Sequence, residues 1–271
     1  MNYDPIKDRL GGIFNRRPFL QRFFYTLLGI FFLRTWYVKR EVRHLLFHMG
    51  TSPRILDAGT GFGQYTWWIL KRWTGARILA VDVKTDYLTA LGRFLKHYGV
   101  SDRVELQTAD LTRDTFEPIY DLVLSVDVME HIEDDRGVFR NLFASMRAGG
   151  YVLVNTPSDL GGSDVAADSD ESFIGEHVRD GYNMDDLREK LETAGFRVTK
   201  SIYTYGWPGS IAWRILIKWP MQLLNQSFGW ILVLPLYYMV ALVPGLLMNG
   251  LDMVGSNERG TGLIVIAQKP E

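Results

Sequence analysis

The sequence predicts a doubly wound α/β fold, in which helices cover both faces of a mainly parallel sheet. Between residues 53 and 156, short apolar segments typical of buried strands alternate with longer segments typical of helices. The first apolar segment leads directly into a glycine-rich turn, Gly59-Thr-Gly-Phe-Gly63, before the next helix. A strand that enters a helix through such a turn forms the ligand-binding corner of this fold class.

The remaining elements follow in regular order and are bounded by turn and cap signals. We expect strands at 54–58, 77–82, 103–108, 119–125, 150–156, 196–203 and 262–268. We expect helices at 63–73, 85–98, 134–147 and 183–194. Asn183 is a good N-cap for the last of these helices, and Gly195 is a good stop. The chain of 271 residues suits one large α/β domain with an insertion.

The N-terminal segment is basic and aromatic, and a single helix is expected over 18–48. Arg22 and Arg34 bracket 11 uncharged positions, too few to span a bilayer but suited to an interfacial helix. Residues 1–43 hold nine Lys or Arg and three Asp or Glu, which gives 9 − 3 = +6; the chain total of −1 leaves −7 for the rest. This asymmetry favours an anionic partner, and the interleaved Phe and Leu favour a membrane over nucleic acid. The alternative is a helix packed on the main domain.

A second apolar segment, 205–259, interrupts the alternation of strands and helices. The 33 residues between Lys218 and Asp252 carry no charge, which is long enough for a transmembrane helix. Pro235, Pro244 and Gly245 argue against one straight helix, and the two prolines are expected to supply bends.

Composition excludes several functions. The chain has no cysteine, which excludes disulfides, cysteine metal sites and thiol catalysis and fits a reducing compartment. The apolar run 23–33 starts late and lacks a small-residue cleavage site, so no secretory signal is expected. We therefore expect a cytoplasmic protein.

Acidic residues at strand ends predict a nucleoside ligand. The spacing Gly59-x-Gly61-x-Gly63 is one residue short of the dinucleotide fingerprint, and Gln64 stands where that fingerprint has Gly or Ala. Asp82 ends the second strand, 23 positions beyond Gly59, where a carboxylate can accept both hydroxyls of a ribose. Asp110 follows the third strand, in position for an adenine amino group.

Longer motifs narrow the choice of ligand. They are Asp57-Ala-Gly-Thr-Gly-Phe-Gly63, Asp82, Ala109-Asp110, Val128-Met-Glu-His-Ile132, Arg147-Ala-Gly-Gly-Tyr-Val-Leu-Val-Asn-Thr-Pro157, Gly175-Glu-His-Val-Arg-Asp-Gly-Tyr182 and Leu191-Glu-Thr-Ala-Gly-Phe196. In this order and spacing, over about residues 50–204 and the last strand, the chain resembles the class I S-adenosylmethionine-dependent methyltransferases. The segment around Glu130 is similar to the ubiquinone-biosynthesis O-methyltransferases.

The resemblance implies a Rossmann-like sheet of seven strands whose last strand is antiparallel. It also implies S-adenosyl-L-methionine as cofactor and a methyltransferase activity. The cofactor-binding residues that it implies are Asp57, Gly59, Gly61, Gly63, Asp82, Val83, Asp110, Leu111 and Val126. The acceptor atom, whether oxygen, nitrogen or carbon, stays open.

Candidate acid–base residues are His131 and His177, because an acceptor hydroxyl must lose its proton and His is the usual base. Each also has a structural alternative as an ordinary hydrogen-bonding His. If the segment is helical, Asp127, Glu130 and His131 share a face and are candidates for a divalent metal, but we assign no metal ligands.

The antiparallel last strand constrains the apolar insertion. The chain must leave the sheet near 205 and return near 260, so a single membrane crossing is excluded. We expect four parts: a basic helical lid or membrane contact (1–49), the cofactor domain (50–204), a monotopic or lid insertion (205–259) and the final strand (260–271). An apolar lid implies a lipid-like or amphipathic acceptor. The alternatives are a soluble small-molecule methyltransferase whose insertion forms a dimer interface, a nicotinamide-dependent oxidoreductase, and a degenerate cofactor-binding scaffold.

Overall fold

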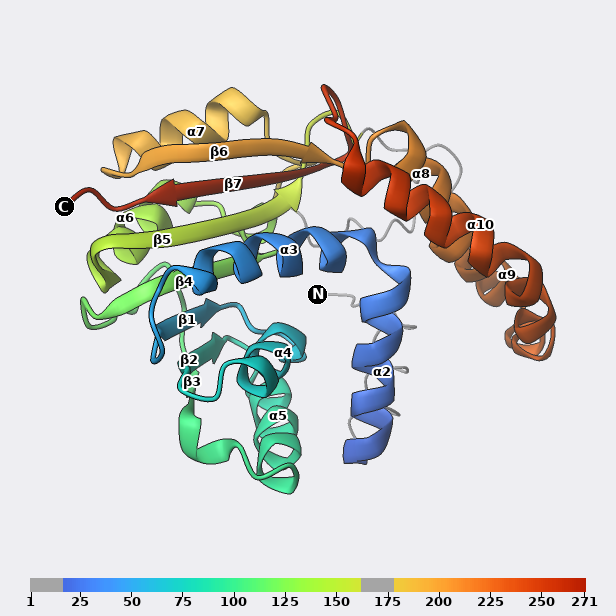
Figure 1. Ribbon diagram of the computed structural model, residues 1–271, viewed down its shortest axis with the longest axis horizontal. Coiled ribbons are helices and arrows are strands. Elements are labelled where there is room, and N and C mark those ends of the chain that lie inside the picture. The colour runs from blue at the N-terminus through green and yellow to red at the C-terminus, as the bar shows by residue number, and fades with distance from the viewer. Residues whose placement is uncertain (1–16, 162–177) are drawn as a thin grey trace.

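The computed structural model describes residues 17–161 and 178–271, and its centre is a sheet of seven strands (Figure 1). The strand order is β3-β2-β1-β4-β5-β7-β6, with β7 antiparallel to both of its neighbours. The strands are β1 (Arg54–Ala58), β2 (Arg77–Asp82), β3 (Val104–Thr108), β4 (Tyr120–Val126), β5 (Met146–Pro157), β6 (Arg197–Thr204) and β7 (Gly262–Gln268). The predicted doubly wound seven-stranded fold with an antiparallel last strand is confirmed.

Helices cover both faces of this sheet. They are α2 (Pro18–Phe31), α3 (Leu33–Phe47), α4 (Gln64–Arg72), α5 (Thr85–His97), α6 (Asp135–Ser145), α7 (Met184–Thr193), α8 (Trp207–Trp213), α9 (Trp219–Gln226) and α10 (Leu234–Val254). Short 3-10 helices occupy Ser101–Arg103, Met129–His131 and Phe228–Leu232, and a π-helical turn occupies Arg214–Lys218. Side chains from α3, α4 and α5 pack on one face of the sheet, and side chains from α6 and α7 pack on the other.

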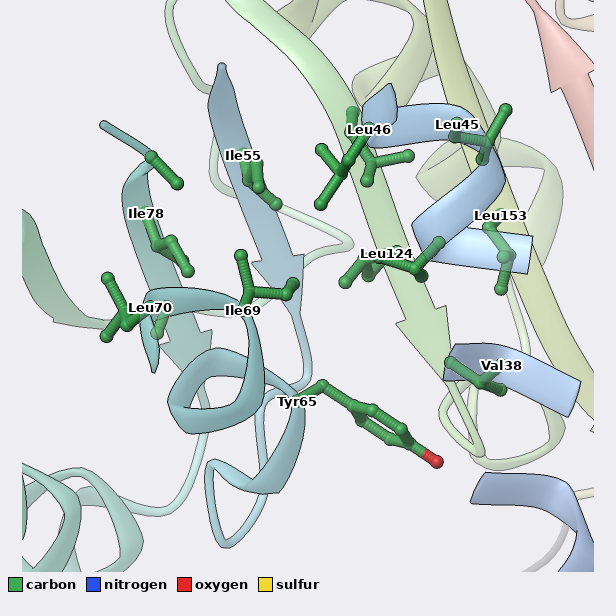
Figure 2. Close-up of a cluster of buried hydrophobic side chains, with 14 of the residues drawn as sticks. Val38, Leu45, Leu46, Ile55, Tyr65, Ile69, Leu70, Ile78, Leu124 and Leu153 are labelled. Atoms are coloured by element: carbon green, nitrogen blue, oxygen red, sulfur yellow. The ribbon is translucent and has the colours of Figure 1, made fainter. Parts of the chain in front are cut away.

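The core on the first face joins α3 and α4 to the middle strands. Figure 2 shows aliphatic side chains from both helices meeting those of the strands, with Val38 and Leu46 on α3 and Ile69 on α4. All three are almost completely buried. Such burial, at roughly 25 cal/mol per Å² of apolar surface, holds α3 firmly against the sheet.

The N-terminal segment forms two helices where the sequence predicted one. Phe32 adopts an extended conformation (φ −92°, ψ 110°) and separates α2 from α3. No proline or adjacent glycine forces this break. Instead, α3 packs along the sheet while α2 turns across the glycine corner, and one straight helix cannot make both sets of contacts (Figure 1).

The late apolar segment forms a helical hairpin, here defined as residues 207–254, that extends beyond the end of the sheet (Figure 1). Of the two predicted bend positions, Pro235 lies close to the reversal of the chain, whereas Pro244 does not interrupt its helix. The chain reverses around the 3-10 helix Phe228–Leu232, Pro235 lies in the first turn of α10, and Pro244 lies within that helix. A proline in the first turn costs nothing because that N–H has no helical acceptor anyway.

The hairpin leaves the sheet and returns to it at neighbouring points, as the sequence required. Thr204, at the end of β6, pairs with Gly262, at the start of β7. Both ends of the insertion therefore lie at the same edge of the sheet, next to the carboxyl ends of β4 and β5.

Candidate functional site

The glycine corner joins β1 to α4, and glycine is required at its three positions for different physical reasons. All three adopt the left-handed region, with φ of +85° at Gly59, +53° at Gly61 and +79° at Gly63. A Cβ on Gly59 would lie 2.3 Å from Val128, and one on Gly63 would lie 2.3 Å from Leu91. A Cβ on Gly61 would meet nothing within 4 Å. Gly61 is therefore the position where a ligand can approach the backbone.

Asp57 holds this corner together from within the protein. Its side chain is buried and accepts hydrogen bonds from the hydroxyls of Thr60 (2.8 Å) and Thr66 (2.6 Å). Burial raises the pKa of Asp57, and the two threonine bonds oppose that rise. The carboxylate is thus engaged with the turn and the first turn of α4.

Asp82 lies at the end of β2 and faces the same corner. One carboxylate oxygen accepts from the Gly61 amide (2.8 Å), and the other accepts from the Lys84 amide (2.9 Å). A carboxylate has about four acceptor positions, so both oxygens can still accept ribose hydroxyls. The neighbouring Val83 is exposed and leaves this side of the corner open.

Asp110 and Leu111 follow β3 and point to different places. The amide and hydroxyl of Thr112 donate to Asp110, and these bonds lower the pKa of its half-exposed carboxyl group. Asp110 therefore stays ionised near neutral pH. Leu111 buries its side chain in the core, so its backbone is the part left to contact an adenine.

Residues after β4 contact helix α3. Val126 ends the strand and is partly buried, and Asp127 follows with φ of +53°. The Asp127 carboxylate forms an ion pair with Arg34 of α3 and accepts from the Asn155 amide group (2.8 Å). Helix α3 is thereby tied to the strand end where the resemblance places the methionine part of the cofactor.

Tyr205 completes this contact from the other side. Its hydroxyl accepts from the Arg34 backbone amide (3.0 Å), and its φ is +56°. Among the described residues, Asp127 and Tyr205 are the two non-glycine positions with positive φ. A bulky residue rarely adopts this conformation, and such strain concentrates at functional sites.

Three buried polar atoms lie at this boundary between α3 and α4, where the Arg34 and Thr35 side chains adjoin the Tyr65 hydroxyl. They are Arg34 Nε, Thr35 Oγ1 and Tyr65 Oη. Figure 2 shows the Tyr65 hydroxyl pointing away from the aliphatic cluster. A buried cluster of polar side chains can hydrogen-bond a polar group of a ligand, so this boundary is suited to receive one.

Helix α2 covers the glycine corner. The Tyr25 hydroxyl donates to the Phe62 carbonyl and accepts from the Gln21 side chain (2.7 Å). Phe24 packs edge-on against the Phe62 ring at a centroid distance of 5.6 Å. This cover limits the access of water to the corner.

His131 and His177 stay predicted acid–base residues. His131 is exposed on the 3-10 helix after β4, and His177 lies outside the described residues. The neighbouring Glu130 is buried, and its carboxylate accepts from the Thr156 hydroxyl (3.1 Å). Burial raises the pKa of Glu130 to about 7.

The metal alternative required an α-helix after β4, and the segment instead forms a single 3-10 turn. Asp127 and Glu130 have the partners described above. Across residues 17–161 and 178–271, no three His, Asp or Glu side chains are grouped to hold a metal ion.

The residues that join helix α3 to the sheet were not among the predicted site residues. Asn155 lies near the carboxyl end of β5 and Tyr65 lies in the first turn of α4, so both lie where ligand contacts are expected in this fold class. Arg34 and Tyr205 meet only through the tertiary fold, 171 positions apart.

Comparisons with known proteins agree with this geometry. Residues 56–152 match the family described as a methyltransferase domain. Phosphoethanolamine N-methyltransferase 1 of Triticum aestivum is 28% identical over 150 residues, covering 54% of this chain and 28% of that protein. Ubiquinone biosynthesis O-methyltransferase of Aeromonas salmonicida is 28% identical over 105 residues, covering 39% of this chain and 43% of that protein. The chain spans less than half the length of either relative.

A solved structure shares the fold. Phosphoethanolamine N-methyltransferase 2 of Haemonchus contortus, in complex with S-adenosyl-L-methionine, superposes with a TM-score of 0.61 at 19% identity, over 100% of this chain and 60% of that chain. Residues 56–152 therefore match a methyltransferase domain, and the chain shares the fold of this solved structure. The open Gly61 backbone and the Asp82 carboxylate of this chain fit the nucleoside of S-adenosyl-L-methionine.

Proposed function

We propose that the protein is a methyltransferase attached to one face of a membrane, on the cytoplasmic side, and that its acceptor is lipid-like or amphipathic. The observation that carries this proposal is the exposed apolar face of the helical hairpin. The residues of this face are Leu232, Leu236, Met239, Val240, Val243, Leu247, Leu251 and Val254, each at least half exposed. Apart from the adjacent pair Met239 and Val240, they recur every three or four positions, so they form one stripe that begins at Leu232 and continues along α10.

The opposite side of α10 packs on the hairpin itself. Ala241 and Gly245 are buried there, and a Cβ on Gly245 would lie 2.5 Å from Leu216. Small residues therefore bring the two arms of the hairpin close together, and the large apolar residues are left outside. An exposed apolar patch of this length is typical of a membrane or protein contact.

The length of α10 alone does not decide its setting. Its 21 residues are long and apolar enough to cross a bilayer, and 17% of its most apolar window is buried. The chain then re-enters the sheet as β7, beside β5 and β6. A monotopic hairpin that dips into one leaflet accommodates both facts.

Aromatic and basic residues suit the polar boundary of a bilayer. Trp207, Trp219 and Trp230 are exposed along the hairpin. Indole rings favour the headgroup layer, and cations favour anionic lipids. The net charge of +6 over residues 1–43 adds an attraction to the same kind of surface.

The cofactor supplies an activated methyl group, whose transfer is an in-line displacement. The chain then has to orient the acceptor and exclude water, which α2 and α3 do by covering the corner and the end of β4. His131 and His177 are proposed bases for an acceptor that must lose a proton. The ubiquinone-type acceptor is one of the lipid-like candidates.

The relatives also support a second candidate, a soluble methyltransferase with a small polar acceptor. Two of them are named for phosphoethanolamine, which carries an amine and a phosphate. In that case the apolar stripe would be the interface of a dimer. A detergent-free mass measurement separates the two candidates: a homogeneous soluble dimer favours the second.

The deciding experiment is flotation with liposomes together with labelled-methyl transfer into a total lipid extract. The wild-type protein should float and label a lipid product. The variant Met239→Asp/Val243→Asp should lose both, whereas Phe47→Asp, equally exposed at the end of α3, should keep both. A wild-type protein that ignores liposomes and labels only water-soluble compounds would contradict the proposal.

Calorimetry tests the cofactor separately. S-adenosylmethionine should bind and NAD should not, and Asp82→Ala should weaken the first by at least tenfold. Wild-type affinity in that variant would remove Asp82 from the site.

A further inference from the structure

Helix α3 contacts both the cofactor site and the base of the helical hairpin. Arg34, in its first turn, pairs with Asp127 at the end of β4. Tyr37, one turn later, donates its hydroxyl to the Asp252 carboxylate (2.7 Å) near the end of α10. Arg40, in the next turn, donates to the Met253 carbonyl (2.9 Å). One helix therefore carries the link from site to hairpin.

The Asp252 carboxylate joins three elements at one point. It is completely buried, and besides Tyr37 it accepts from the Gly209 amide of α8 (2.9 Å) and the Asn257 side chain (3.1 Å). A Cβ on Gly209 would lie 2.6 Å from both Leu33 and Asp252. Such close packing leaves little room for α3, α8 and α10 to move independently.

The entry to the hairpin reaches the same turn of α3. Tyr205 precedes α8 by two positions, and its hydroxyl accepts from the Arg34 amide. On the other side of the Phe32 break, the Phe31 ring lies 4.9 Å from the Tyr238 ring of α10. Both ends of the hairpin and its longest helix therefore contact the segment that bears Arg34.

The Arg34 turn is also the costly part of this arrangement. Tyr205 and Asp127 have positive φ on either side of it, and Arg34 Nε, Thr35 Oγ1 and Tyr65 Oη are buried next to one another. Backbone strain at this place means that a small shift of this turn, or a bound ligand, recovers free energy. A movement of the hairpin base is therefore transmitted to the turn of α3 that bears Arg34.

We propose that α3 couples the hairpin to the cofactor site, so that docking of the hairpin on a lipid surface tightens cofactor binding. This inference rests on the proposed membrane attachment. The lipid surface is anionic, because the hairpin carries Arg214 and Lys218 and the N-terminal segment is basic. By linkage, the cofactor must tighten binding to the lipid surface by the same factor.

The test uses the full chain, S-adenosylhomocysteine and phosphatidylglycerol vesicles. Calorimetry should show at least about a fivefold tighter affinity for S-adenosylhomocysteine when vesicles are present. Flotation at limiting lipid should improve by the same factor when S-adenosylhomocysteine is added. Equal affinity with and without vesicles, in a protein that floats, would overturn the coupling alone. A protein that does not float overturns the coupling together with the membrane proposal.

Variants locate the route. Tyr37→Phe removes the donor to Asp252 and should float normally while losing the vesicle effect on S-adenosylhomocysteine affinity. Tyr203→Phe is the matched control, since its hydroxyl makes no hydrogen bond within residues 17–161 and 178–271, and it should keep the effect. If Tyr37→Phe does not fold, Arg40→Met, which has no donor for the Met253 carbonyl, replaces it. An unchanged vesicle effect in the folded variant would overturn the route through α3.

Discussion

Tyr238 supplies the hydrogen bond that Pro220 cannot. In a regular helix the Leu216 carbonyl would accept from the amide of residue 220, but proline has no N–H, and the Tyr238 hydroxyl donates to that carbonyl instead (2.8 Å). The adjoining π-helical turn, in which the Trp219 amide bonds to Arg214, similarly frees the Ile215 carbonyl. Tyr237 donates to it at 2.7 Å. The two arms of the hairpin are thus joined by hydrogen bonds from α10 to carbonyl groups that have no backbone donor within their own arm.

Tyr238→Phe should therefore destabilise the hairpin. The change leaves the Leu216 carbonyl without a donor, at a cost of about 1–3 kcal/mol. Thermal unfolding in lipid or mild detergent measures it. Tyr151→Phe, on β5, should cost less, and an equal loss in both variants would contradict the account.

Substitutions in the glycine corner should affect the free energy of unfolding and the cofactor affinity to different extents. Gly61→Ala places a side chain in open space, so its cost should be the left-handed penalty of about 1–2 kcal/mol, with a large loss of cofactor affinity. Gly63→Ala adds a collision with Leu91 and should cost about 1–3 kcal/mol more. Urea unfolding and calorimetry check the pair; retained affinity in Gly61→Ala would place the cofactor elsewhere.

Thr66→Val tests the bonds that Asp57 receives. Removing a hydroxyl that donates to a buried carboxylate should cost about 1.5–3 kcal/mol of unfolding free energy. Thr89→Val, at an exposed position of α5, is the control and should change stability by less than about 0.5 kcal/mol. Similar losses in both would argue against this role of Asp57.

Glu130 should make stability depend on pH. Its folded pKa of about 7 lies above the ordinary glutamate value of 4.5, so the folded state holds its proton more tightly than the unfolded state. The contribution is fully present below about pH 4.5 and is lost as pH rises through about 7, with a slope of at most about 1.4 kcal/mol per pH unit. Urea unfolding between pH 5 and 8 should show Glu130→Gln gaining on the wild type as pH rises. A constant difference would contradict the shift.

Local sequence signals located most of the catalytic domain. Asn183 caps α7 as predicted, accepting from the Asp185 amide (3.0 Å), and Gly195 ends that region with φ of +106°. Strand β5 begins earlier than predicted, at Met146, because Gly149 and Gly150 lie within the strand. Signals of this kind act within a few residues of their own position.

The break between α2 and α3 and the course of the hairpin are features that local sequence signals did not predict. Nothing near Phe32 indicates a break, since the break results from α2 and α3 packing on different surfaces. The Arg34–Tyr205 contact likewise joins distant segments. A bend was predicted at Pro244, but this residue lies inside α10, where neighbouring contacts maintain the helix. Tertiary packing decided each of these features.

The pairing of Thr204 with Gly262 also bears on how such a protein can arise and be re-engineered. These two residues are the last and first of adjacent antiparallel strands, a distance that a short β-turn can close. The 57 intervening residues, 205–261, are thus a graft between strands that would pair without it. A lineage could gain or discard this insertion without changing the order of a single strand in the sheet.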